Sequence, residues 1–147
     1  MDYKLDRISY EAGMINCFIE MVACGVKPLA ISPPIEPENL ALIEEISKEL
    51  SEGFGTKWLT VQSLMITDIQ SAEFTKGKHS VLYYKDDAVI ERYMELSALV
   101  DSLSEKGEYS GKRRTDISIE FGRMLGYPDN VIFEKIENVG NMDPVTL

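Results

Sequence analysis

The spacing of hydrophobic residues predicts a chain of amphipathic helices interrupted by short strands. The first helix is expected from about Ser9 to Ala23, with Ser9 as the N-cap and Gly25 as the C-terminal stop. Its apolar residues form two adjacent stripes, one of Ile8, Ala12, Ile15, Ile19 and Val22, the other of Met14, Cys17, Phe18, Met21 and Cys24. Because only a narrow polar strip remains, this helix should be buried on most of its sides or should also form a subunit contact.

The rest of the chain alternates between strand-like and helix-like segments. Strands are predicted at residues 26–32, 56–66 and 79–85, and helices at residues 37–55, from Asp86 or Asp87 to about Leu103, from Thr115 to Leu125, and after Asp129. Gly77 could turn a hairpin between Ala72–Lys76 and His79–Lys85, which leaves Ala72–Lys76 either a strand or a loop.

This order of elements predicts an α/β fold. We expect a small sheet of three to four strands packed against helices, with a helical C-terminal third. The first two strands, joined by the helix at residues 37–55, should form a parallel pair with a right-handed crossover. Residues 1–137 are expected to form one domain, followed by a poorly ordered tail at residues 138–147.

Composition narrows the possible partners. The chain has 147 residues and a formal net charge of −10, which opposes binding to nucleic acid or to an anionic membrane surface. No apolar run is long enough to span a membrane, and the polar N-terminus has no signal-peptide pattern. A cytoplasmic protein is the expectation.

The two cysteines are predicted to be buried, unpaired thiols. Cys17 and Cys24 would lie about 10.5 Å apart along one helix at 1.5 Å per residue, too far to form a disulfide with each other. A redox-sensitive thiol is the alternative. With His79 as the only histidine, neither a metal site nor a cofactor is expected.

Three consecutive cations precede the helix predicted from Thr115. Lys112, Arg113 and Arg114 are unfavourable at a helix start unless an anion lies there, where free N–H groups and the helix dipole would also attract it. Together with the Thr115 hydroxyl they form a candidate anion-binding site. The alternative is a solvated loop whose cations balance neighbouring acids such as Glu108. The segment does not match a phosphate-binding P-loop.

No set of catalytic residues is recognisable. A serine triad would need His79, and no G-x-S-x-G motif is present. Both cysteines lie on an apolar helix, which should raise a thiol pKa rather than activate it. The sequence therefore leaves open whether the protein is an enzyme.

Two segments carry a family resemblance. "SVLYYKDDAVIERYM" (residues 80–94) and "DISIEFGRMLGYPDNVIFEKI" (residues 116–136) resemble an uncharacterised prokaryotic family of small α/β proteins with an "LGYP" helix junction. The resemblance covers about a quarter of the chain and implies no activity, substrate or cofactor. That family tends to begin the helix before "LGYP" with a His-Glu pair, whereas this chain has Ser118-Ile119-Glu120 there, so no role of that histidine carries over.

Two functional hypotheses follow. The favoured one is a non-catalytic binding or protein-interaction module, with a homodimer formed through the apolar first helix. The alternative is a small anion- or nucleotide-binding protein, with or without enzymatic activity, that uses the helix start at Lys112–Thr115.

Overall fold

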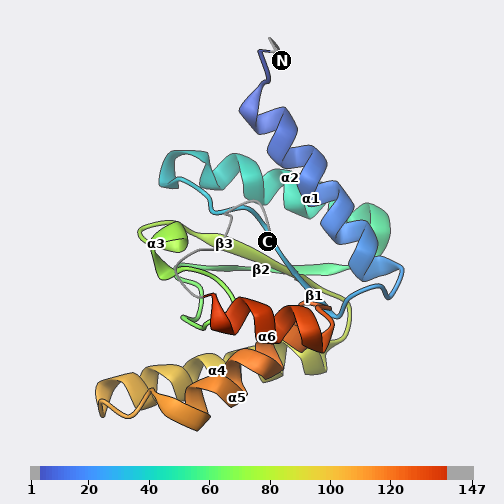
Figure 1. The fold of residues 1–147 in the computed structure, drawn as a ribbon. Helices are drawn as coiled ribbons and strands as arrows, with labels where there is room; N and C mark the ends of the chain where they lie inside the picture. Colours follow the sequence, from blue (N-terminus) through green and yellow to red (C-terminus); the bar gives the residue numbers. More distant parts are fainter. Residues whose placement is uncertain (1–3, 139–147) are drawn as a thin grey trace.

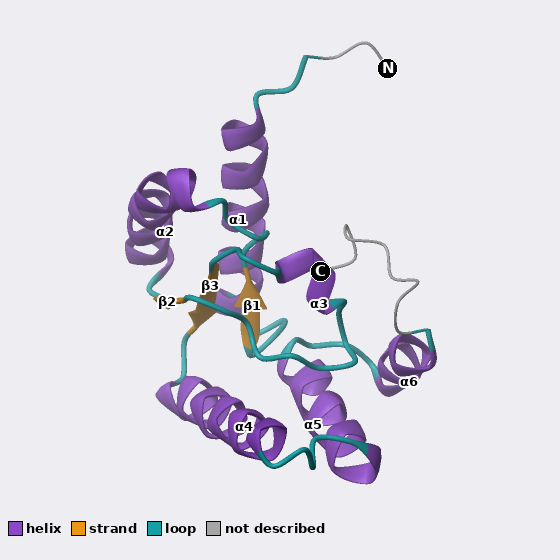
Figure 2. Ribbon diagram, turned by 90° about the vertical axis from the view of Figure 1, so that its left-hand side faces the viewer, coloured by secondary structure: helices purple, strands orange, loops and turns teal. Residues whose placement is uncertain are grey.

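In the computed structural model, which describes residues 4–138, a three-stranded antiparallel sheet lies between two layers of helices (Figures 1 and 2). In chain order the elements are α1 (Arg7–Ala23), β1 (Leu29–Ile31), η1 (Pro37–Asn39), α2 (Leu40–Phe54), β2 (Lys57–Val61), α3 (Ala72–Thr75), β3 (Ser80–Tyr84), α4 (Asp87–Glu105), α5 (Gly111–Met124) and α6 (Asp129–Glu137). Apart from Asn138, the predicted disordered tail lies outside the described residues.

The central strand of the sheet is β3. It pairs antiparallel with β1 on one side and with β2 on the other, in a register that places Tyr83 opposite both Ala30 and Trp58. Its first four residues are buried, whereas β2 is partly exposed along its length. A continuous apolar run such as "SVLYY" is typical of a strand covered on both faces, and that explains its central place.

The prediction of a parallel strand pair is wrong. The connection from β1 through α2 to β2 exists, and β1 and β2 do run in the same direction. However, β3 lies between them and pairs with each, so every pairing in the described sheet is antiparallel. The pairing partners of a strand depend on which strand is covered on both faces, and this is not a local property of the sequence.

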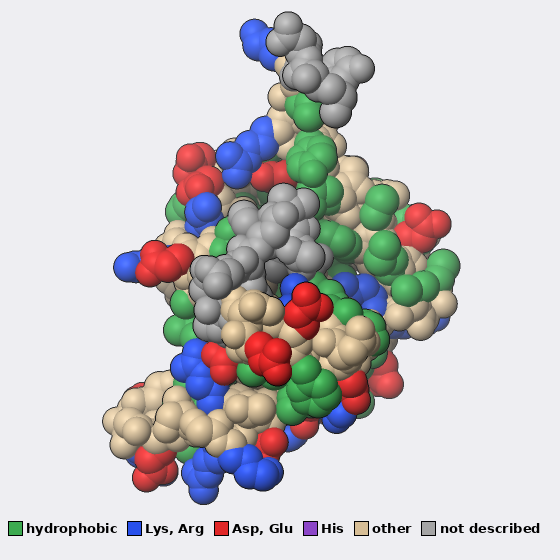
Figure 3. Space-filling view, in the orientation of Figure 1, with side chains coloured by type: hydrophobic (Ala, Val, Ile, Leu, Met, Phe, Trp, Pro, Cys, Tyr) green, Lys and Arg blue, Asp and Glu red, His purple; other side chains and the backbone are tan. Residues whose placement is uncertain are grey.

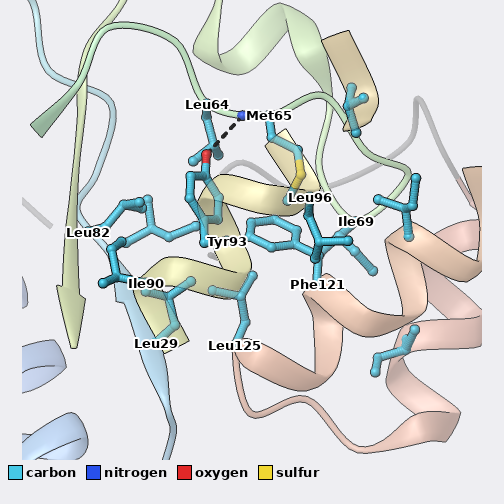
Figure 4. Close-up of a cluster of buried hydrophobic side chains, with 14 of the residues drawn as sticks. Leu29, Leu64, Met65, Ile69, Leu82, Ile90, Tyr93, Leu96, Phe121 and Leu125 are labelled. Carbon is cyan, nitrogen blue, oxygen red and sulfur yellow. Dashed lines mark hydrogen bonds between the residues drawn. The ribbon is translucent and has the colours of Figure 1, made fainter. Parts of the chain in front are cut away.

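Each face of the sheet has its own hydrophobic core. Alternate residues of β3 point to opposite faces, so Val81 and Tyr83 pack with α1 and α2 while Leu82 packs with α4 and α5. In Figure 2, α1 and α2 lie on one side of the sheet and α4 and α5 on the other. The core on the side of α4 and α5 also includes residues of the long connection after β2. There the backbone N–H of Met65 donates a 3.1 Å hydrogen bond to the Tyr93 hydroxyl (Figure 4).

Several helix starts differ from those predicted. Asp6, not Ser9, is the N-cap of α1, and its carboxylate accepts from the Ser9 N–H at 2.9 Å. The Ser9 hydroxyl also donates to this carboxylate, and these hydrogen bonds lower the pKa of Asp6. Of the two candidates Asp86 and Asp87, Asp86 is the N-cap of α4. Pro128 rather than Asp129 precedes α6.

The predicted hairpin is also absent from the described residues. Ala72–Thr75 forms the short helix α3 instead of a strand, and Gly77 turns the chain at a positive φ of 71°. His79 then makes a single antiparallel bridge with Ile35 before β3 begins. Both sides of β3 are already paired, with β1 and with β2, so Ala72–Lys76 cannot pair with it as a hairpin arm.

The "LGYP" segment joins α5 to α6. Helix α5 ends at Met124 with Leu125 as its C-cap, Gly126 adopts the left-handed conformation with φ of 81°, and α6 begins after Pro128. Ile117, Phe121 and Leu125 are buried in the core under α4 and α5. Tyr127 packs against the same core. No helix within residues 4–138 is both long and apolar enough to cross a bilayer.

Candidate functional site

The basic segment at Lys112–Arg114 lies inside a helix, not in front of one. Helix α5 begins at Gly111, with Ser110 as its N-cap, so the three cations occupy its first turn. Thr115 is not the cap: its hydroxyl donates to the Gly111 carbonyl at 3.2 Å, as interior threonines do. The loop between α4 and α5 spans residues 106–110, so α5 begins four residues before Thr115.

Each of the three cations is paired with a carboxylate. Lys112 bonds Asp116 at 2.7 Å, Arg113 lies 3.8 Å from Glu108, and Arg114 bonds Asp68 at 2.8 Å. These carboxylates offset the unfavourable position of the cations at the positive end of the helix dipole. Lys112 and Arg113 extend into solvent, with 88% and 68% of their side-chain surface exposed.

Arg114 contacts other parts of the fold instead of extending into solvent. Its guanidinium stacks 4.8 Å from the centre of the Tyr109 ring, and its hydrogen bond to Asp68 raises its pKa. The Asp68 N–H in turn donates to the Ser118 hydroxyl at 2.9 Å, and the Tyr109 hydroxyl donates to the carbonyl of Ile66. Together these contacts fasten the connection after β2 to α5. Anion binding at Lys112–Thr115 stays a prediction, and the contacts found here favour the pairing with neighbouring acids.

The described residues contain no cluster of three or more His, Cys, Asp or Glu side chains that could hold a metal ion. His79 is half-buried just before β3 and lies far along the sequence from Cys17 and Cys24. Its Nδ1 atom has no hydrogen-bond partner among the described residues. Among the described residues, we therefore recognise no catalytic arrangement in which a nucleophile, a base and an orienting group contact one another.

The prediction of buried cysteines is wrong, and this draws attention to α1. Cys17 and Cys24 are both exposed. The buried residues of α1 are Glu11, Ile15, Ile19 and Val22, and the three apolar ones pack in the core with the sheet and α2. Of the second apolar stripe, Cys17, Met21 and Cys24 are exposed, whereas Met14 is half-buried and Phe18 packs against the core. A sequence pattern cannot tell which side of an apolar helix meets the rest of the protein.

The exposed side of α1 carries an apolar stripe with a heptad spacing. We call this the α1 seam: Tyr10, Met14, Cys17, Met21 and Cys24. Successive members are separated by four, three, four and three residues, which is the a/d spacing of a two-stranded coiled coil. At 100° per residue all five fall within about 80° of the helix circumference. Tyr10 is 52% exposed and Met21 is 40% exposed, while Met14 is half-buried. Hydrophobic side chains line the course of α1 in the space-filling view (Figure 3).

A surface hollow adjoins the N-terminal end of the α1 seam. It has a volume of about 280 Å³. Its lining residues are Arg7, Tyr10, Glu11 and Met14 of α1 together with Pro33, Pro34, Phe74 and Lys78. Its charges are matched, because Arg7 bonds Glu11 at 3.1 Å and Lys78 bonds Glu36 at 3.3 Å. The hollow therefore extends the apolar surface of the seam without adding net charge.

The segment that carries the α1 seam is electrically neutral. Residues 4–27 contain three cations, Lys4, Arg7 and Lys27, and three anions, Asp6, Glu11 and Glu20, so their formal charges sum to zero. The net charge of −10 is thus carried by the remainder of the chain. A neutral apolar surface on an acidic protein is the region that another acidic protein can approach with least repulsion.

Comparison with models of protein families, with curated proteins and with solved structures finds no match to this chain. The resemblance of residues 80–94 and 116–136 to a prokaryotic family stays a prediction. The α1 seam is the feature on which the sequence and the fold agree most: four of its five residues belong to the second apolar stripe seen in the sequence, and the fold leaves three of these four exposed.

Proposed function

We propose that this protein is a non-catalytic protein-interaction module that forms a homodimer through the α1 seam. The observation that carries the proposal is an exposed a/d stripe on a helix whose opposite side is already packed in the core. Two-stranded helix contacts bury such stripes, and exposed apolar surface of this kind commonly marks an interaction site.

The neutrality of residues 4–27 supports a second copy as the partner. Two chains with a net charge of −10 repel each other, and the repulsion is smallest where the facing surfaces carry no net charge. The stripe is short, five residues on one helix, so we expect a reversible dimer of moderate affinity rather than an obligate one.

The test is the mass of the reduced protein by light scattering over a range of micromolar concentrations. The expected mass approaches twice the 16.6 kDa of one chain. Met21→Lys places a charge in the seam and should weaken the dimer at least about tenfold. Met94→Lys is the matched control, because Met94 is an equally accessible methionine, 50% exposed, on the distant helix α4.

A monomeric mass for the wild-type protein at every concentration would refute the homodimer. If Met21→Lys and Met94→Lys weakened the dimer equally, this would count against the α1 seam as the dimer contact, because the effect would then come from the added charge alone.

A further inference from the structure

We infer that the two α1 helices of the homodimer pair antiparallel, with Met14 facing Cys24 of the second copy and Cys17 facing Met21 of the second copy. This inference rests on the proposed homodimer. It specifies the orientation and register of that contact, which the presence of an apolar stripe alone does not.

The first argument is the volume of the side chains in each layer of the contact. Met14 and Met21 occupy the a positions of the α1 seam, and Tyr10, Cys17 and Cys24 occupy the d positions. In a parallel pair, a faces a and d faces d, so two long methionines meet in one layer and two small cysteines in the next. In an antiparallel pair, a faces d, and each of the four central layers combines one methionine with one cysteine.

A helix contact whose layers have equal side-chain volume packs better than one in which crowded and empty layers alternate. A layer of two cysteines leaves a gap beside a layer of two methionines, and both gaps and overpacking cost stability. Combining a large residue with a small one in every layer fills the contact uniformly. The composition of the α1 seam therefore favours the antiparallel arrangement.

The second argument is electrostatic and independent of packing. In Figures 1 and 2 the N-terminal end of α1 projects beyond the sheet, and the rest of the fold lies toward its C-terminal end. A parallel pair would set the two acidic bodies side by side and align the two helix dipoles. An antiparallel pair places the bodies at opposite ends of the contact and opposes the dipoles, both of which lower the repulsion.

The register predicts which thiols can be cross-linked. At 1.5 Å per residue, the two copies of Cys24 would be offset by about 15 Å along the helices and the two copies of Cys17 by about 6 Å, whereas positions 17 and 21 face each other directly. A disulfide needs Cα atoms within about 7 Å, and helix axes are already about 8–10 Å apart. A parallel pair would instead bring each cysteine opposite its own copy.

The experiment measures disulfide dimer formation with oxidised glutathione on non-reducing gels. In the net reaction two protein thiols are oxidised to a disulfide, and one glutathione disulfide is reduced to two thiols. Three proteins are compared: Cys17→Ser, which keeps Cys24; Cys24→Ser, which keeps Cys17; and Cys24→Ser/Met21→Cys, which has thiols at positions 17 and 21. A fourth, Cys17→Ser/Cys24→Ser/Met21→Cys, controls for the added thiol alone.

We expect the variant with thiols at positions 17 and 21 to form the disulfide dimer at least about tenfold faster than the three single-thiol proteins. Fast dimer formation by Cys17→Ser or Cys24→Ser would overturn the antiparallel orientation in favour of a parallel one. If no variant cross-links while reduced wild-type protein has the dimer mass, the register is wrong but the homodimer stands. A monomeric reduced wild type would refute the homodimer itself.

Discussion

The contact between α5 and α6 offers a stability prediction whose sign can be worked out from the structure. Gly122 lies in α5, and a Cβ placed there would be 2.8 Å from Cγ1 and 3.0 Å from Cδ1 of Ile132, and 3.1 Å from Cδ1 of Ile69. Ile132 and Ile69 are fully buried or nearly so, so they have little room to move. Glycine therefore lets α6 approach α5 closely at this point.

Two opposing effects decide the outcome of Gly122→Ala. Replacing glycine by alanine inside a helix stabilises the folded state by about 1 kcal/mol. Inserting a methyl group into a packed core costs about 1–3 kcal/mol, and contacts below 3.0 Å place this site in the upper part of that range. We expect a net loss of about 1–2 kcal/mol in the free energy of unfolding.

Gly53→Ala is the matched control. Gly53 lies near the end of α2, and a Cβ there would have no atom within 4 Å, so only the helix-propensity gain of about 0.5–1 kcal/mol should remain. Urea denaturation of both variants and the wild type measures the difference in the free energy of unfolding, as a shift of the unfolding midpoint at a constant denaturant dependence. Ile132→Val, which removes Cδ1, should partly restore the stability of Gly122→Ala in a double-mutant cycle.

A Gly122→Ala protein as stable as Gly53→Ala would refute this reasoning. It would mean that α6 can move away from α5 at no cost, and that the corner at Gly126 does not hold the two helices in a fixed separation.

Three further predictions concern side chains rather than backbone. Arg114→Ala should lower the free energy of unfolding by roughly 1–2 kcal/mol because it leaves Asp68 unpaired, whereas Arg113→Ala should change it by less than about 0.5 kcal/mol; urea denaturation compares them, and equal effects would contradict the structural role of Arg114. If an anion does bind at this helix start, phosphate or sulfate should raise the melting temperature of the wild type but not of Arg113→Ala/Arg114→Ala, and a shift that persists in the double variant would place the binding elsewhere. Burial raises the pKa of Tyr83 and Tyr93 above the usual value of about 10, so their contribution to stability is full below pH 10 and should decline above it by about 1.4 kcal/mol per pH unit for each tyrosine. Urea midpoints measured between about pH 9 and pH 11 test this, and a constant midpoint would contradict it.

Local signals in the sequence determined most of the elements of the fold. The apolar spacing predicted the helices later found as α1, α2, α4, α5 and α6 and the strands found as β1, β2 and β3. The break between α5 and α6 follows from backbone preferences alone, because only glycine adopts the left-handed conformation without strain and proline cannot continue a helix, although the restart was predicted after Asp129 rather than after Pro128. Helix starts were less certain, since Asp6 and Ser9 are equally good capping residues within one turn of each other, and Ser110 and Thr115 are equally good candidates five residues apart.

Tertiary structure alone decided the features on which function depends. Strand order follows from which strand is buried on both faces, and this placed β3 between β1 and β2. Arg114 and Asp68 are 46 residues apart, so their pairing is invisible to any local pattern. The sequence showed two apolar stripes on α1, but only the packing of Ile15 and Ile19 against the sheet determined that Cys17, Met21 and Cys24 face outward. A helix that is apolar nearly all round has no intrinsic inside, and the rest of the fold chooses which face it covers.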